Sequence, residues 1–128
     1  MAEMNGDQSA DLAEKAMEIK DKNSLNQLAI GAIEVDVEGN IQYYSRAESE
    51  LTGLEPDEVV GKNFFRDVAP CCRNRNFLDH FEKVVQKKAR EERFEYLFTD
   101  AIKPVRVKVI LKSSLIDDDY WIFIKKKD

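Results

Sequence analysis

Alternating apolar and polar residues in the final third of the chain predict three β-strands, and this pattern constrains the fold more than any other. Apolar side chains recur at every second position over 94–98 and 105–111, and residues 120–124 are aromatic and β-branched. Turn-forming residues at 101–104 and 117–119 separate the three segments. Strands joined by connections this short pair antiparallel, so we expect an antiparallel sheet.

A β-hairpin is predicted earlier in the chain. Ile33 and Val35 alternate with acidic residues, and the turn sequence Glu-Gly-Asn follows at 38–40. The apolar and aromatic segment 41–44 then supplies the returning strand. Tyr43 and Tyr44 are consecutive on this strand, so their side chains are expected to face opposite sides of the sheet.

Four helical segments are predicted between the hairpin and the last three strands. Their bounds follow from side chains that cap a first turn, from proline in a first turn, and from glycine after a last turn. We expect the first over 47–51, with Ser45 as the N-cap and Gly53 as the stop, and the second from Pro56 to Gly61. The third is expected over 63–68 and ends at Pro70. The fourth, over 77–88, is an amphipathic helix that packs on the sheet.

Two strands, several helices and three further strands indicate an α+β domain whose antiparallel sheet carries its helices mainly on one face. We assign residues 30–128 to this domain. Residues 1–29 differ from the rest of the chain in composition and pattern, with a weak apolar stripe over 11–21. We predict that they form an N-terminal helical cap. A helix this short is marginal alone, so it must dock on the domain.

Size and charge exclude several classes of protein. The chain has 128 residues, enough for one domain. Its net charge of −5 has the wrong sign for binding nucleic acid or an anionic membrane. No apolar stretch approaches the roughly 20 residues that cross a bilayer, and the first twenty residues lack the apolar segment of a signal peptide. A cytoplasmic location is therefore expected.

The cysteine and histidine content argues against disulfides, metals and catalysis. Cys71 and Cys72 are adjacent, so they cannot form an ordinary disulfide and do not have the spacing of metal ligands. An enzyme would need Cys71 as nucleophile with His80, the single histidine, as base. Nothing in their spacing brings the two together. We expect a protein that is not an enzyme and holds no metal.

Motifs spread over residues 26–126 point to one family. They are Ala32-Ile33, Asp36, Gly39-Asn40-Ile41, Glu48, Thr52-Gly53, Gly61-Lys62-Asn63-Phe64-Phe65, Asp67-Val68-Ala69-Pro70-Cys71, Phe94-Glu95-Tyr96 and Tyr120-Trp121. Their order resembles the PAS domain family and, more closely, the photoactive yellow proteins within it. The resemblance implies a PAS-like five-stranded antiparallel sheet and the function of a blue-light photoreceptor.

The resemblance also implies a cofactor and its site. Cys71 is expected to carry 4-hydroxycinnamic acid (p-coumaric acid) as a thioester. Tyr44 and a protonated Glu48 match the groups that hydrogen-bond its phenolate, Thr52 supports Tyr44, and Phe98 supplies an aromatic wall. Trans–cis isomerisation, proton transfer from Glu48 and partial unfolding would then signal to an unidentified partner. The chain is expected to be a monomer or a weak dimer.

Three positions depart from the family pattern. Leu54 stands where an arginine commonly covers the phenolic end, Asp100 where an aromatic residue is usual, and Ile102 where a methionine assists the return to the dark state. Asp100 is expected to point into solvent, as an ordinary loop residue does. Cys72 is expected to be a bystander.

Each key residue also has a purely structural interpretation. Cys71 fits an inert core cysteine. Glu48 lies three residues after Ser45, the spacing of a capping box in which Glu48 reaches back to the N-cap amide. If these interpretations hold, the chain is a chromophore-free PAS module for protein interaction or small-ligand binding.

Overall fold

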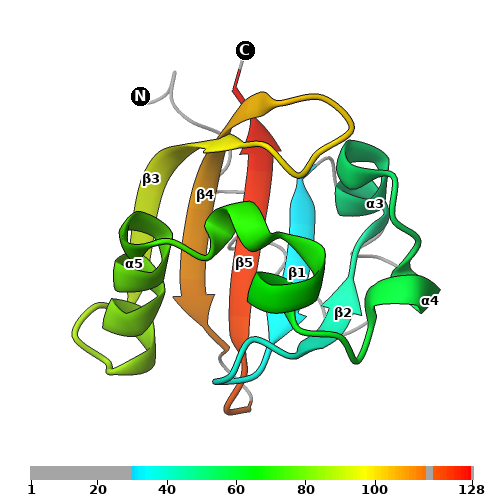
Figure 1. The fold of residues 1–128 in the computed structure, drawn as a ribbon. Coiled ribbons are helices and arrows are strands. Elements are labelled where there is room, and N and C mark those ends of the chain that lie inside the picture. Colours follow the sequence, from blue (N-terminus) through cyan, green and yellow to red (C-terminus); the bar gives the residue numbers. More distant parts are fainter. Residues whose placement is uncertain (1–29, 115–116, 128) are drawn as a thin grey trace, which may run out of the picture.

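Five strands form one antiparallel sheet in the computed structural model, which describes residues 30–114 and 117–127 (Figure 1). The strands are β1 (Gly31–Val35), β2 (Ile41–Tyr44), β3 (Glu91–Phe98), β4 (Val105–Ser113) and β5 (Tyr120–Lys126). They lie in the order β2-β1-β5-β4-β3, and every neighbouring pair is antiparallel. The hairpin and the three C-terminal strands predicted from the sequence are confirmed.

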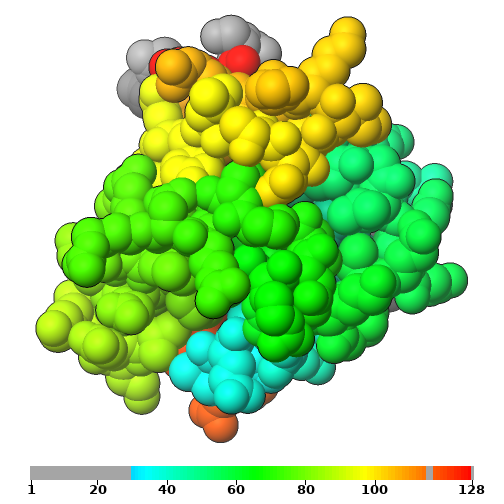
Figure 2. Space-filling view, viewed as in Figure 1, coloured from blue at the N-terminus to red at the C-terminus, as the bar shows by residue number. Residues whose placement is uncertain are grey.

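The helical segments between β2 and β3 cover one face of this sheet (Figure 1). They are α3 (Arg46–Thr52), α4 (Pro56–Val59), the π-helical turn η1 (Phe64–Val68), the 3-10 turn η2 (Pro70–Cys72) and α5 (Arg75–Val85). Figure 2 shows these segments and the β3–β4 connection hiding nearly all of the sheet. The arrangement confirms the predicted α+β class with helices on one face.

The main core fills the space between the sheet and the helical segments. Alternate residues of each strand point into it, among them Ile33, Val109 and Ile122, and meet the aromatic rings of Phe64 and Phe77. The opposite face of the sheet carries Trp121 and Phe123, whose rings stack with centroids 5.7 Å apart. Four consecutive residues of β5, Trp121–Ile124, are therefore buried, and the strand presents apolar side chains on both faces of the sheet.

Local capping explains where α3 and α4 begin and end. The Ser45 hydroxyl caps α3, and Gly53 ends it at φ 80°, a left-handed conformation that suits glycine. Pro56 occupies the first turn of α4. These predictions are confirmed, although α4 stops at Val59, before Gly61.

Two helical predictions needed correction. Pro70 does not simply end a helix over 63–68, because it also begins the turn that contains Cys71. The amphipathic helix runs from Arg75 to Val85, whereas the sequence indicated 77–88. The Asn74 side chain accepts a hydrogen bond from the Phe77 amide and so starts the helix two residues earlier.

The predicted N-terminal cap, residues 1–29, lies outside the described residues. The division into a cap and a domain over 30–128 therefore stays a prediction.

Ser45 joins β1 to α3, and its replacement by alanine is expected to destabilise the domain. Its buried hydroxyl oxygen accepts hydrogen bonds from the Ala32 amide at 2.8 Å and the Glu48 amide at 3.4 Å. Ser45→Ala leaves both donors without this partner, which we expect to cost about 1–3 kcal/mol in urea unfolding. Ser49→Ala on the same helix is the control. Equal unfolding free energies for the two variants would contradict the assigned role.

Candidate functional site

Cys71 lies in the η2 turn with its peptide group held on both sides. Its amide donates to the Asp100 carboxylate, with 2.6 Å between N and Oδ2. Its carbonyl accepts from the Asn74 side-chain amide at 2.7 Å and from the Tyr96 hydroxyl. Residues from two other elements and a loop thus fix the position of this cysteine.

The thiol of Cys71 is partly exposed and acidic. Its pKa falls from 9.0 to about 7, mainly through the hydrogen bond between its sulfur and that of Cys72. Burial and the Asp100 side chain oppose this shift, and backbone amides of Thr99 and Asp100 support it. A partly exposed thiol that is substantially ionised at neutral pH is a nucleophile, which favours the reactive interpretation over an inert core cysteine.

Glu48 is completely buried on α3, and none of the described residues supplies a hydrogen bond to either of its carboxylate oxygens. Burial raises its pKa from 4.5 to about 8. Glu48 therefore carries a proton at neutral pH and has nothing beside it, within the described chain, to receive that proton.

The alternative role of Glu48 in a capping box is wrong. Its backbone amide does donate to the Ser45 hydroxyl, but its carboxylate does not return a hydrogen bond. The amide that it would have to reach, that of Ser45, already donates to the Ala32 carbonyl at 3.0 Å. The Ser45 amide, which the capping box requires as a donor, is therefore already hydrogen-bonded to strand β1.

Gly31 makes room for this carboxyl group and was missed in the sequence. A Cβ atom on Gly31 would lie 2.3 Å from Oε1 of Glu48, far inside van der Waals contact. A glycine at the start of a strand is itself a sign of a close approach, so the signal was present.

Tyr44 and Thr52 form a second part of the site. Their side-chain oxygens lie 2.7 Å apart. The Thr52 hydroxyl also donates to the Glu48 carbonyl at 3.1 Å, so in this arrangement Tyr44 is the donor to Thr52. Tyr44 faces the core, while Tyr43 contacts Trp121 on the opposite face, as the sequence predicted. Burial, before any other cause, raises the pKa of Tyr44.

The remaining predicted positions lie around this core. Phe98, at the end of β3, is completely buried within it. Leu54 is half-buried against the same core, and Ile102 is 67% exposed. Sequence reasoning placed Asp100 in solvent, and this was wrong because its carboxylate binds the Cys71 amide. Cys72 is not a simple bystander either, since its sulfur lies 3.9 Å from that of Cys71.

The β3–β4 connection links the two parts of the site. Through Asp100 it binds Cys71, and two residues later the Ile102 amide donates to the Leu51 carbonyl of α3 at 3.2 Å. Figure 2 shows this connection lying directly against the helical segments. One short loop therefore contacts both the turn with Cys71 and the helix with Glu48.

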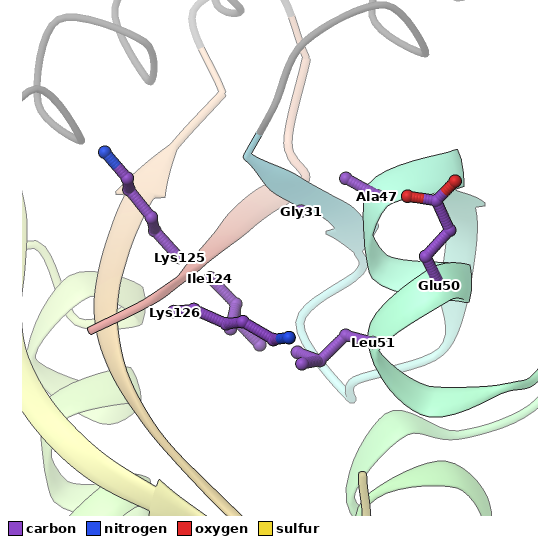
Figure 3. Close-up of a pocket in the computed structure, with 7 residues that line it drawn as sticks. All are labelled: Gly31, Ala47, Glu50, Leu51, Ile124, Lys125 and Lys126. Atoms are coloured by element: carbon purple, nitrogen blue, oxygen red, sulfur yellow. The ribbon is translucent and has the colours of Figure 1, made fainter. Parts of the chain in front are cut away.

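A separate pocket of about 270 Å³ opens between α3 and the ends of β1 and β5 (Figure 3). Lys126 and Leu51 extend toward each other across it, while Lys125 points away. None of the residues predicted to bind the chromophore lines it. Lys125 and Lys126 lie at the C-terminal end of β5, a central strand of the sheet.

His80 is engaged away from the cysteines. Its Nδ1 lies 2.8 Å from the Glu92 carboxylate, and its ring stacks on Phe94 with 4.0 Å between centroids. The described contacts thus pair His80 with β3 and provide no support for a Cys71–His80 catalytic pair.

Comparison with known proteins identifies the family. The PAS fold model matches residues 21–124. The chain is 47% identical to photoactive yellow protein of Halochromatium salexigens, over 80% of this chain and 82% of that protein, and 42% identical to that of Rhodothalassium salexigens, over 88% and 90%. The photoactive yellow protein domain of the sensor histidine kinase Ppr from Rhodospirillum centenum superposes with a TM-score of 0.79 at 36% identity, covering 88% of this chain and 98% of that one.

The fold and these matches define a PAS domain, a class of sensory rather than catalytic modules. Within that class, the chain belongs to the photoactive yellow proteins, which are blue-light photoreceptors. In the part of the chain that the structure describes, no helix is long and apolar enough to cross a membrane. The cytoplasmic location stays a prediction.

Replacing Glu48 with glutamine is expected to remove a pH dependence of stability. The folded pKa of about 8 exceeds the ordinary 4.5, so the folded chain retains a proton that the unfolded chain loses between these values. This stabilisation is complete below the ordinary pKa and is lost as the pH rises through the folded pKa, at up to about 1.4 kcal/mol per pH unit.

Urea unfolding of the pigment-free protein measures this effect. Between about pH 5 and about pH 8, wild type should lose on the order of 3 kcal/mol relative to Glu48→Gln. Parallel pH profiles for the two proteins would show that Glu48 is ionised in the folded state.

Proposed function

We propose that this photoreceptor carries 4-hydroxycinnamic acid as a thioester on Cys71, with its phenolic oxygen held by Tyr44 and Glu48. The observation that carries the proposal is the Glu48 carboxyl, which is fully buried and has no hydrogen-bond partner among the described residues. Native proteins rarely leave a buried polar group unpaired, because this costs about 1–3 kcal/mol. A phenolate ligand would supply the missing acceptor.

When bound, 4-hydroxycinnamic acid supplies absorption of blue light and trans–cis isomerisation about its double bond. Glu48 holds a proton at a carboxylate oxygen in the dark because its raised pKa keeps it neutral. A neutral acid that loses its proton in an apolar pocket becomes an unpaired buried charge, which costs on the order of 3–5 kcal/mol. Loss of the Glu48 proton therefore strongly favours opening of the structure.

Tyr44 can provide the second hydrogen bond by exchanging partners. Its hydroxyl donates to Thr52 in the pigment-free chain, and the Thr52 proton goes to the Glu48 carbonyl. Rotation of the Thr52 hydroxyl toward Tyr44 keeps the 2.7 Å contact and frees the Tyr44 proton for a phenolic oxygen. Thr52 thus supports Tyr44 in either arrangement.

We assign signalling to the segments that border Glu48. An ionised Glu48 would weaken α3, and the Ile102–Leu51 hydrogen bond would pass the change to the β3–β4 connection. Residues 1–29 are the other segment proposed to be released. The partner is a signalling protein of unidentified type; the related domain of Ppr belongs to a sensor histidine kinase.

Attachment at Cys71 is tested by intact mass after adding an activated 4-hydroxycinnamic ester to the purified chain. We expect one added hydroxycinnamoyl group in wild type, retained in Cys72→Ala and absent in Cys71→Ala, because only Cys71 combines exposure with an acidic thiol. A visible absorption band should appear in the same samples. A colourless, unmodified wild type would favour the chromophore-free PAS module.

Light should loosen the chain unevenly. In pigment-bearing protein under continuous blue light, hydrogen exchange is expected to accelerate in residues 45–53, which border Glu48, and in residues 1–29, whose predicted helix over 11–21 has only a weak apolar stripe. The strand β4 should stay protected, since it lies between two paired neighbours. Identical exchange in darkness and light, in a sample shown to be bleached, would contradict the mechanism.

A further inference from the structure

Cys72 lies against the attachment cysteine without being able to replace it. It is completely buried, and burial raises the pKa of its thiol, so it keeps its proton. The two sulfurs are 3.9 Å apart, within reach of a thiol hydrogen bond. A disulfide between them is disfavoured, because neighbouring Cα atoms are about 3.8 Å apart while disulfides usually need about 4.4–6.8 Å. The protonated thiol of Cys72 can therefore donate a hydrogen bond that the sulfur of Cys71 accepts.

Asp100 occupies the other side of Cys71. Its carboxylate binds the Cys71 amide at 2.6 Å, and from this position it raises the pKa of the Cys71 thiol. A carboxylate beside a thiol disfavours the thiolate, since the two anions repel. Cys71 is thus placed between a group that promotes its ionisation and a group that opposes it.

We propose that Cys72 and Asp100 are positioning residues that set the reactivity of Cys71 in opposite directions when its acyl group is attached. The Cys72 thiol donates to Sγ of Cys71 and increases the fraction of thiolate. The Asp100 carboxylate anchors the Cys71 peptide and decreases that fraction. The role in acylation rests on the proposed function, whereas the control of thiol reactivity can be measured without any pigment.

The step is a thioester exchange that these residues prepare. Sγ of Cys71 attacks the carbonyl carbon of an activated hydroxycinnamoyl thioester, so that a new carbon–sulfur bond forms. The bond from that carbon to the sulfur of the donor breaks, and the departing thiolate takes a proton from water. No oxidant or reductant is needed. Cys72 acts only through its hydrogen bond and stays unmodified.

The titratable groups that face this thiol come from three parts of the fold. Cys72 shares its turn, Asp100 lies in the β3–β4 connection, and Tyr96 on β3 donates to the Cys71 carbonyl. Glu48 on α3 raises the pKa of Cys72 when Glu48 is ionised. Of these, Cys72 contacts the Cys71 sulfur and Asp100 binds the Cys71 amide, and both shift the pKa of the Cys71 thiol, so they are the residues to vary.

The rate of alkylation of Cys71 by iodoacetamide, followed against pH by mass spectrometry, tests the proposal directly. Wild type should show a midpoint near 7, the pKa of Cys71. Cys72→Ala should move the midpoint upward, toward the ordinary thiol value of 9.0. At neutral pH the thiolate fraction then falls about fiftyfold, but the more basic thiolate is more nucleophilic, so the reaction should slow by a net factor of about six.

Two further variants keep the test decisive if the alanine variant folds poorly. Cys72→Ser retains a hydroxyl donor and should restore a midpoint close to that of wild type. Asp100→Asn keeps an acceptor for the Cys71 amide but removes the negative charge, so its midpoint should fall below that of wild type. Equal midpoints in all four proteins, or shifts in the same direction for Cys72→Ala and Asp100→Asn, would overturn the proposal.

A parallel measurement with the activated hydroxycinnamoyl thioester separates this inference from the proposed function. Shifted alkylation midpoints without any acylation would support control of the thiol and contradict the pigment. Acylation of wild type together with unshifted midpoints would support the pigment and overturn the roles of Cys72 and Asp100.

Discussion

The burial of the Glu48 carboxyl is the constraint around which this domain is organised. Transferring such a group out of water without a partner costs several kcal/mol if it is ionised, so it is kept protonated. The surrounding structure is built to accept it: Gly31 leaves space for Oε1, and Ser45 joins the helix of Glu48 to the neighbouring strand. The result is a buried, protonated carboxyl group with no hydrogen-bond partner among the described residues.

The second organising feature is the set of hydrogen bonds that hold Cys71 in place. Three side chains bind its peptide group, and the Cys72 thiol lies 3.9 Å from its sulfur. The β3–β4 connection that carries Asp100 also contacts α3 through Ile102. One short loop therefore links the helix that holds Glu48 to the turn that holds Cys71.

Much of the fold could be predicted because it depends on neighbours in the chain. Strand alternation, the capping hydroxyl of Ser45 and the left-handed stop at Gly53 are local features, and all are found. The start of α5 was placed two residues late, because the Asn74 cap extends the helix beyond its apolar pattern. The site residues came from the family resemblance, which named Tyr44, Glu48, Thr52, Cys71 and Phe98 but not the contacts of Gly31, Asn74 and Asp100.

The sequence by itself determined the order of elements, the strand faces and the family, since period, caps and motifs are written along the chain. Only the tertiary structure decided what Glu48 and Asp100 do. Local spacing favoured a capping box for Glu48, but the Ser45 amide that the box requires donates instead to the Ala32 carbonyl of β1. Asp100 meets Cys71 across 29 positions of sequence. Such contacts depend on how the sheet and the helical layer pack, so no local pattern encodes them.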